Sequence, residues 1–185
     1  MRVLGISGSL RRGSYNAALL EAAGRLLPPG AELVRYEGLR DLPAYDEDLD
    51  REGEPGPVAR LRSQIAAADA VLIATPEYNA SIPGALKNAI DWASRPYPEN
   101  ALRDKPVAVI GASTGIFGAV WAQAELRKVL HHAGARPLEE ELALGTAAQA
   151  FGPGGELRDP ELRERLGAIV AALVREARAP VALAA

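Results

Sequence analysis

Residues 70–92 read AVLIATPEYNASIPGALKNAIDW. The first six residues, 70–75, are almost entirely apolar, which is typical of a strand buried on both faces of a parallel sheet. A turn with two prolines follows, and Pro83 is compatible with the first turn of a helix that begins at about that position. This segment therefore predicts a strand, a rigid turn and a helix, which is the repeating unit of an α/β fold.

The same alternation continues on both sides of this segment. Further strands are predicted at 2–6, 32–36 and 107–111, and a fifth within 136–144. Helical spacing of apolar residues between and after these strands predicts the helices, whose stripes are Leu19, Leu20, Ala23, Leu26 and Leu27; Leu61, Ile65 and Ala68; Ala122, Leu126, Val129, Leu130 and Ala133; and Leu162, Leu166, Ile169, Val170 and Leu173. Residues 41–57 and 145–155 are predicted loops. We expect a single domain over residues 1–185, a three-layer α/β sandwich with a five-stranded parallel sheet and helices on both faces.

The amino-acid composition excludes several classes of function. The net charge of -3 and the pI near 5.5 give no large positive field, so we expect no nucleic-acid partner. The chain has no cysteine, which excludes disulfides, iron–sulfur clusters and a cysteine nucleophile, and any redox chemistry must be borrowed from a cofactor. Neither a signal-peptide apolar region nor a membrane span is recognisable, and we expect a cytoplasmic protein without a membrane partner.

Ligands of open α/β sheets bind beyond the carboxyl ends of the strands. The loop after the first strand carries small, hydroxyl and arginine residues and leads directly into a helix, whose N-terminus suits a phosphate. Its candidate residues are Ser9, Arg11, Ser14, Tyr15 and Asn16. The alternative is a surface loop with Ser14 as an ordinary helix cap. Neither the dinucleotide-binding nor the nucleoside-triphosphate fingerprint is present.

The turn after residues 70–75 is the second candidate. Two prolines and Gly84 make its backbone rigid, which suits recognition of the edge of a flat heterocycle, and Tyr78 is placed to wall one side of such a ring. The alternative for Tyr78 and Trp92 is a packing role. Lys87 and Asp91 are spaced as an ordinary surface ion pair.

The third candidate, Gly111-Ala112-Ser113-Thr114-Gly115, matches the G-x-S-x-G nucleophile elbow of hydrolases. Such an enzyme needs a histidine near the serine, but His131 and His132 are predicted near the far end of the following helix. We therefore favour a loop that admits the edge of a ring. The acidic run at 46–50 lacks the spacing of a calcium loop, and no metal site is predicted.

These motifs resemble those of the NADPH-dependent FMN reductase family, which includes quinone, chromate and azo-dye reductases. The similarity rests mainly on TPEYN at 75–79, SIPG at 81–84 and LKNAIDW at 86–92, with GSLR at 8–11 as the second match. The resemblance implies a flavodoxin-like sheet of strand order 2-1-3-4-5, FMN as cofactor, and a homodimer or homotetramer. Carried over to this chain, Ser9, Arg11, Ser14, Tyr15 and Asn16 would hold the FMN phosphate and its ribityl approach; Pro76, Glu77, Tyr78 and Asn79 would border the isoalloxazine; Ser113 and Gly115 would line its pyrimidine side.

The activity implied by this resemblance is transfer of reducing equivalents from NADPH or NADH, through bound FMN, to a quinone, free flavin or similar small acceptor. A flavin carries the difficult chemistry itself, which agrees with a site that has no cysteine and no well-placed histidine. If both substrates use one flavin face, turnover is ping-pong. The alternative is an electron carrier like a flavodoxin, but such carriers usually have a threonine-rich phosphate loop and a much more acidic surface, whereas this loop contains Arg11 and Arg12.

Overall fold

The computed structural model describes residues 1–179, and the last six residues of the predicted domain lie outside them. A five-stranded, all-parallel sheet has the order β2-β1-β3-β4-β5, as predicted. Its strands are β1 (Arg2–Ser7), β2 (Glu32–Tyr36), β3 (Ala70–Thr75), β4 (Pro106–Ala112) and β5 (Arg136–Leu144). The helices are α1 (Tyr15–Arg25), α2 (Glu47–Glu52), α3 (Gly56–Ala66), α4 (Gly84–Ala93), α5 (Val120–His132) and α6 (Pro160–Arg178), with short 3-10 turns η1 (Leu39–Asp41) and η2 (Ala147–Gln149).

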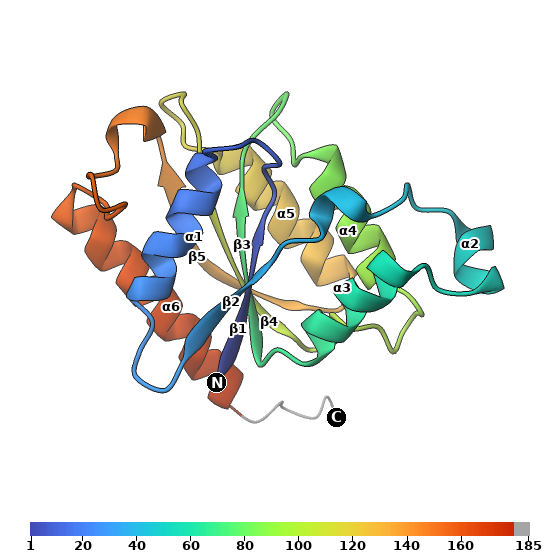
Figure 1. The fold of residues 1–185 in the computed structure, drawn as a ribbon. Helices are drawn as coiled ribbons and strands as arrows, with labels where there is room; N and C mark the ends of the chain where they lie inside the picture. Colours follow the sequence, from blue (N-terminus) through green and yellow to red (C-terminus); the bar gives the residue numbers. More distant parts are fainter. Residues whose placement is uncertain (180–185) are drawn as a thin grey trace.

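Helices cover both faces of the sheet, so the predicted three-layer sandwich is confirmed (Figure 1). Helices α1 and α6 lie on one face, and α3, α4 and α5 lie on the other. Side chains of the central strand β3 alternate between the two layers: Val71 and Ile73 pack toward α3–α5, and Leu72 and Ala74 toward α1 and α6. All six residues of β3 are buried, which explains why its sequence shows no polar alternation.

The two stretches predicted as loops contain short helical segments. Residues 41–57 include α2, whose N-cap Asp46 accepts a hydrogen bond from the backbone N–H of Asp48 at 2.9 Å. Arg62 on α3 holds this segment through Asp50 at 2.9 Å and Glu54 at 2.8 Å. A helix of six residues has too little intrinsic stability to be recognised from its pattern, and the tertiary ion pairs hold it. The second stretch, 145–155, contains η2.

The carboxyl ends of all five strands meet at one edge of the sheet, because the strands are parallel. The connections from β1 to α1, from β3 to α4 and from β4 to α5 lie together at this edge, at the top of Figure 1. The strand order reverses between β1 and β3, and these two strands are hydrogen-bonded to each other. Among residues 1–179, no helix is both long and apolar enough to cross a membrane.

Candidate functional site

The loop from β1 to α1 is drawn tightly against β3. The backbone N–H of Gly8 donates to the carbonyl of Ala74 at 2.8 Å. A Cβ atom at position 8 would lie 2.9 Å from Leu86 Cδ2 and 3.2 Å from Pro76 Cδ, so any other residue here would have to displace these side chains. The predicted phosphate loop and the predicted flavin turn are therefore in direct contact.

The loop leaves a set of donors open at the start of α1. Ser14 caps the helix, its Oγ accepting from the backbone N–H groups of Asn16 at 3.2 Å and Ala17 at 3.3 Å. By contrast, the backbone N–H groups of residues 10–15 donate to no other group within residues 1–179. Arg11 makes no ion pair with a carboxylate in that part of the chain, and its guanidinium lies 5.1 Å from the centroid of the Tyr15 ring. Open amides, a helix N-terminus and an unneutralised arginine together form an anion-binding arrangement.

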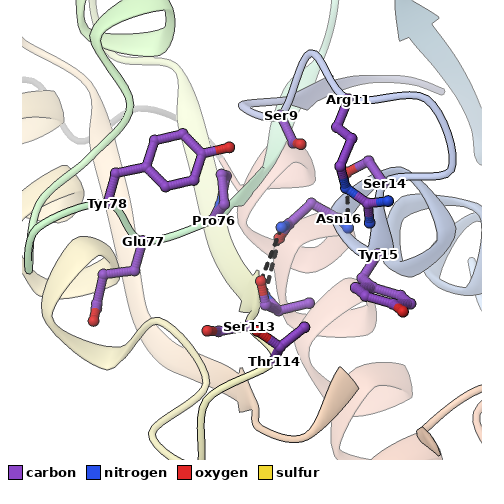
Figure 2. Close-up of a pocket in the computed structure, with 11 residues that line it drawn as sticks. Ser9, Arg11, Ser14, Tyr15, Asn16, Pro76, Glu77, Tyr78, Ser113 and Thr114 are labelled. Atoms are coloured by element: carbon purple, nitrogen blue, oxygen red, sulfur yellow. Dashed lines mark hydrogen bonds between the residues drawn. The ribbon is translucent and has the colours of Figure 1, made fainter. Parts of the chain in front are cut away.

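Asn16 links this loop to the end of β4. Its Nδ2 donates to the carbonyl of Ala112, and its Oδ1 accepts from the N–H of the same residue, both at 2.9 Å. The side chain is buried, and both bonds are drawn in Figure 2. The sequence predicts a cofactor role for Asn16, and the structure adds that its amide already joins two of the three loops.

The turn after β3 is closed by two backbone hydrogen bonds between its ends. The N–H of Tyr78 donates to the carbonyl of Ser81 at 3.0 Å, and the N–H of Ser81 donates back at 3.1 Å. Asn79 and Ala80 between them both have positive φ, 53° and 58°. The turn is therefore rigid, as predicted, and it holds Tyr78 with 53% of its surface exposed and its ring directed toward the arginine loop (Figure 2).

The loop after β4 is tied to the chain beyond β5. Ser113 donates its N–H to the carbonyl of Leu144 and accepts from the N–H of Ala147, both at 3.0 Å. Its Oγ accepts from the N–H of Gly115 at 3.1 Å. Ser113 precedes the N-terminus of α5, whereas His131 and His132 occupy the C-terminus of that helix, on the order of 17 Å away along its axis at 1.5 Å per residue. This separation argues against the hydrolase alternative.

These three loops enclose a cavity of about 330 Å³ (Figure 2). Nine of the eleven predicted site residues line it, and Asn79 and Gly115 do not. The lining residues are Ser9, Arg11, Ser14, Tyr15, Asn16, Pro76, Glu77, Tyr78, Ala112, Ser113 and Thr114. Sequence reasoning missed Ala112 and Thr114, although both flank Ser113 within the G-x-S-x-G motif.

The remaining candidates have structural roles. Trp92 is fully buried and its Nε1 donates to the carbonyl of Pro43 at 2.9 Å, so the packing alternative is the correct one for this residue. Lys87 and Asp91 form the predicted surface pair, with Nζ 2.7 Å from Oδ1. Two carboxylates of the acidic run at 46–50 cap α2 and bind Arg62, as described above.

Comparison with known proteins identifies the family. The sequence profile described as NADPH-dependent FMN reductase matches residues 1–149 of this chain. The chain belongs to this family. Its predicted resemblance is thereby confirmed, and with it the prediction of an oxidoreductase that uses FMN and a nicotinamide nucleotide.

Individual members of the family are close in sequence and structure. An NAD(P)H-dependent FMN reductase of Pseudomonas aeruginosa is 50% identical over 165 residues, covering 89% of this chain and 88% of the relative. A quinone reductase of Pseudomonas putida is 42% identical over 155 residues, covering 83% of each chain. The solved structure of a flavoenzyme NAD(P)H:(acceptor) oxidoreductase from Paracoccus denitrificans superposes with a TM-score of 0.87 at 40% identity, covering 95% of this chain and 96% of that one.

The cavity fits the cofactor of this reductase family. A dianionic phosphate matches the open N–H groups of residues 10–15, which donate to no other acceptor in the described chain. It also matches the Arg11 guanidinium, whose only hydrogen bond within residues 1–179 runs from Nη1 to the carbonyl of Arg12 at 3.3 Å. A flat ring matches the rigid turn at 76–81 and the Tyr78 ring beside it. Bound FMN supplies hydride acceptance and delivery, and this explains why the site needs no acid, base or nucleophile of its own.

Proposed function

We propose that this chain is an NAD(P)H-dependent FMN reductase that passes reducing equivalents to quinones, free flavin or similar small acceptors. The phosphate and ribityl chain of FMN lie at Ser9, Arg11, Ser14, Tyr15 and Asn16, and the isoalloxazine lies along Pro76–Asn79 with Ser113 and Gly115 at its pyrimidine side. The observation that carries the proposal is the anion-binding start of α1, with its open N–H groups and Arg11, directly beside a rigid turn. All of these groups belong to one FMN-binding domain, residues 1–185.

The protein's part in catalysis is to bind and to orient. Arg11 and the N-terminus of α1 neutralise the phosphate, and the hydrogen bonds between Asn16 and Ala112 keep the two loops beside it at a constant separation. The Tyr78 ring, half of it exposed, limits the side from which a second flat molecule approaches. Nicotinamide and acceptor then use the same open side in turn, and turnover is ping-pong.

The test begins with purified protein. We expect a yellow holoprotein whose visible absorbance is bleached by NADH or NADPH alone, and parallel double-reciprocal plots with a quinone or free FMN as second substrate. Protein that stays colourless with excess FMN would contradict the cofactor site, and intersecting plots would contradict a shared face. A flavin that binds but is not bleached by either nicotinamide would instead indicate the electron carrier.

We also propose that the protein is a homodimer or homotetramer in the cytoplasm. Three apolar side chains beside the cavity are strongly exposed: Ile116 by 74%, Phe117 by 57% and Trp121 by 49%. Adjacent exposed apolar residues of this size mark an interaction surface, and a second copy of the chain is the occupant that would also enclose the flavin. Light scattering gives the mass directly, and a monomer at micromolar concentration would contradict this proposal.

A further inference from the structure

Helix α5 begins without a cap of its own. The residue before it, Ala119, has a left-handed backbone with φ 67° and ψ 32°, and its side chain offers no acceptor. An alanine in this left-handed conformation is strained, and such strain persists only where the surroundings hold it. The N–H of Val120 donates to the carbonyl of Phe117 at 3.2 Å, but the next two N–H groups, those of Trp121 and Ala122, need an acceptor from elsewhere in the molecule.

Glu77 supplies that acceptor from the turn after β3. Its Oε2 accepts from the backbone N–H groups of Trp121 and Ala122, both at 3.0 Å. The carboxylate also lies at the positive end of the helix dipole, which stabilises a negative charge. In Figure 2 the Glu77 side chain points away from Arg11 and Ser14. Its backbone thus borders the cavity while its carboxylate binds the neighbouring helix.

A second bond joins the same two elements about one helical turn further along. Ser81 Oγ donates to Glu125 Oε2 at 2.6 Å, from the far end of the tight turn that begins at Tyr78. The turn is therefore held against α5 at two points. Because α5 follows directly from the loop that contains Ser113, these bonds set the distance between two walls of the cavity.

From this geometry we propose that Glu77 is a positioning residue, whose carboxylate sets the width of the flavin cavity by capping α5. The proposal rests on the proposed location of FMN and assigns Glu77 no contact with the reacting atoms. The proposed role requires an acceptor oxygen on the side chain of residue 77, because two backbone N–H groups of α5 donate to it.

The test compares Glu77→Ala with Glu77→Gln. The glutamine variant keeps an acceptor oxygen on a side chain of the same length, whereas the alanine variant removes it. We expect Glu77→Ala to weaken FMN binding about tenfold and to change the visible spectrum of the bound flavin, and Glu77→Gln to restore binding to within about threefold of wild type. Amide exchange of Trp121 and Ala122 should be faster in Glu77→Ala alone, with or without FMN.

A matched control removes a cap from another helix. Asp159 caps α6 through the N–H of Glu161 at 2.8 Å and does not line the cavity, so Asp159→Ala should lower stability and leave FMN affinity unchanged. Wild-type FMN affinity in Glu77→Ala overturns the proposal, as does an equal loss of affinity in Asp159→Ala or in Glu77→Gln. If wild-type protein itself binds no FMN, the proposed function fails instead, and the exchange of Trp121 and Ala122 still tests the cap.

Discussion

The amino and carboxyl edges of the sheet differ in whether their backbone polar groups have hydrogen-bond partners within the protein. At the amino edge, side chains bind backbone carbonyls of the segments that lead into the strands: Lys105 Nζ donates to the carbonyl of Ala68, Asn100 Nδ2 to that of Ala133 at 3.1 Å, and Arg136 Nε to that of Asp104 at 3.0 Å. At the carboxyl edge, the backbone N–H groups of residues 10–15 have no such partner in the described chain. One edge is closed by its own side chains, and the other is open to a ligand.

Backbone strain follows the same division. Five non-glycine residues in the described chain have positive φ. Four of them, Asn79, Ala80, Ala119 and Thr146, lie in loops at the carboxyl edge, and only Asp104 lies at the amino edge. Strained backbone lowers the stability of the fold. Its concentration at the carboxyl edge therefore indicates that a functional site lies there.

The largest effect is expected from Arg11→Ala, which removes the charge from the open edge. FMN binding should weaken by one to two orders of magnitude, because hydrogen bonds to charged groups contribute about 1.5 to 3 kcal/mol. Quenching of flavin fluorescence on titration of the apoprotein measures the dissociation constant. The neighbouring Arg12→Ala carries the same change of charge but does not line the cavity, and should have little effect. Equal losses in both variants would show that only the general field of the loop matters.

The two buried asparagines offer a paired test of the two edges. Asn16 and Asn100 are both buried, and each bonds backbone groups through both its Oδ1 and its Nδ2. Replacing either by alanine should lower the free energy of unfolding of the apoprotein by about 2 kcal/mol, since buried backbone groups lose their partners. Only Asn16→Ala should also weaken FMN binding. If Asn100→Ala weakens FMN binding as much, the two edges of the sheet are not independent.

The smallest effect is expected from Lys105→Met at the closed edge. Burial lowers the pKa of Lys105 below its ordinary value of 10.5, while the charge of Asp69 opposes the shift. Loss of its hydrogen bonds should cost about 1 kcal/mol at neutral pH, with no change in FMN affinity. A depressed pKa means that the unfolded chain binds more protons, so the stability contributed by Lys105 rises as pH increases toward 10.5.

Urea unfolding of wild type and Lys105→Met at neutral and alkaline pH measures this difference. The gap between the two proteins should widen as the pH rises through the range just below 10.5. A gap that narrows there would show that the charged ammonium, and not its neutral form, is the species that the fold favours.

Much of the fold was predictable because its signals are local. The apolar run 70–75 lies within the strand it defines, and Pro83 lies next to the helix it was expected to open; both elements are found as expected. Helix α2 was missed because ion pairs from Arg62, and no periodic pattern, support it. The site was predictable in outline for a related reason, since parallel strands bring the ends of β1, β3 and β4 to one edge whatever their loops contain.

The sequence by itself determined the strands, the helices other than α2, the strand order implied by the family and the three loops that meet. The tertiary structure alone decided what the polar side chains in those loops do. Asn16 bonds a residue 96 positions away, and Glu77 bonds the start of a helix 44 positions away. Such partners are chosen by the packing of helices against the sheet, which brings together groups whose separation along the chain carries no local pattern.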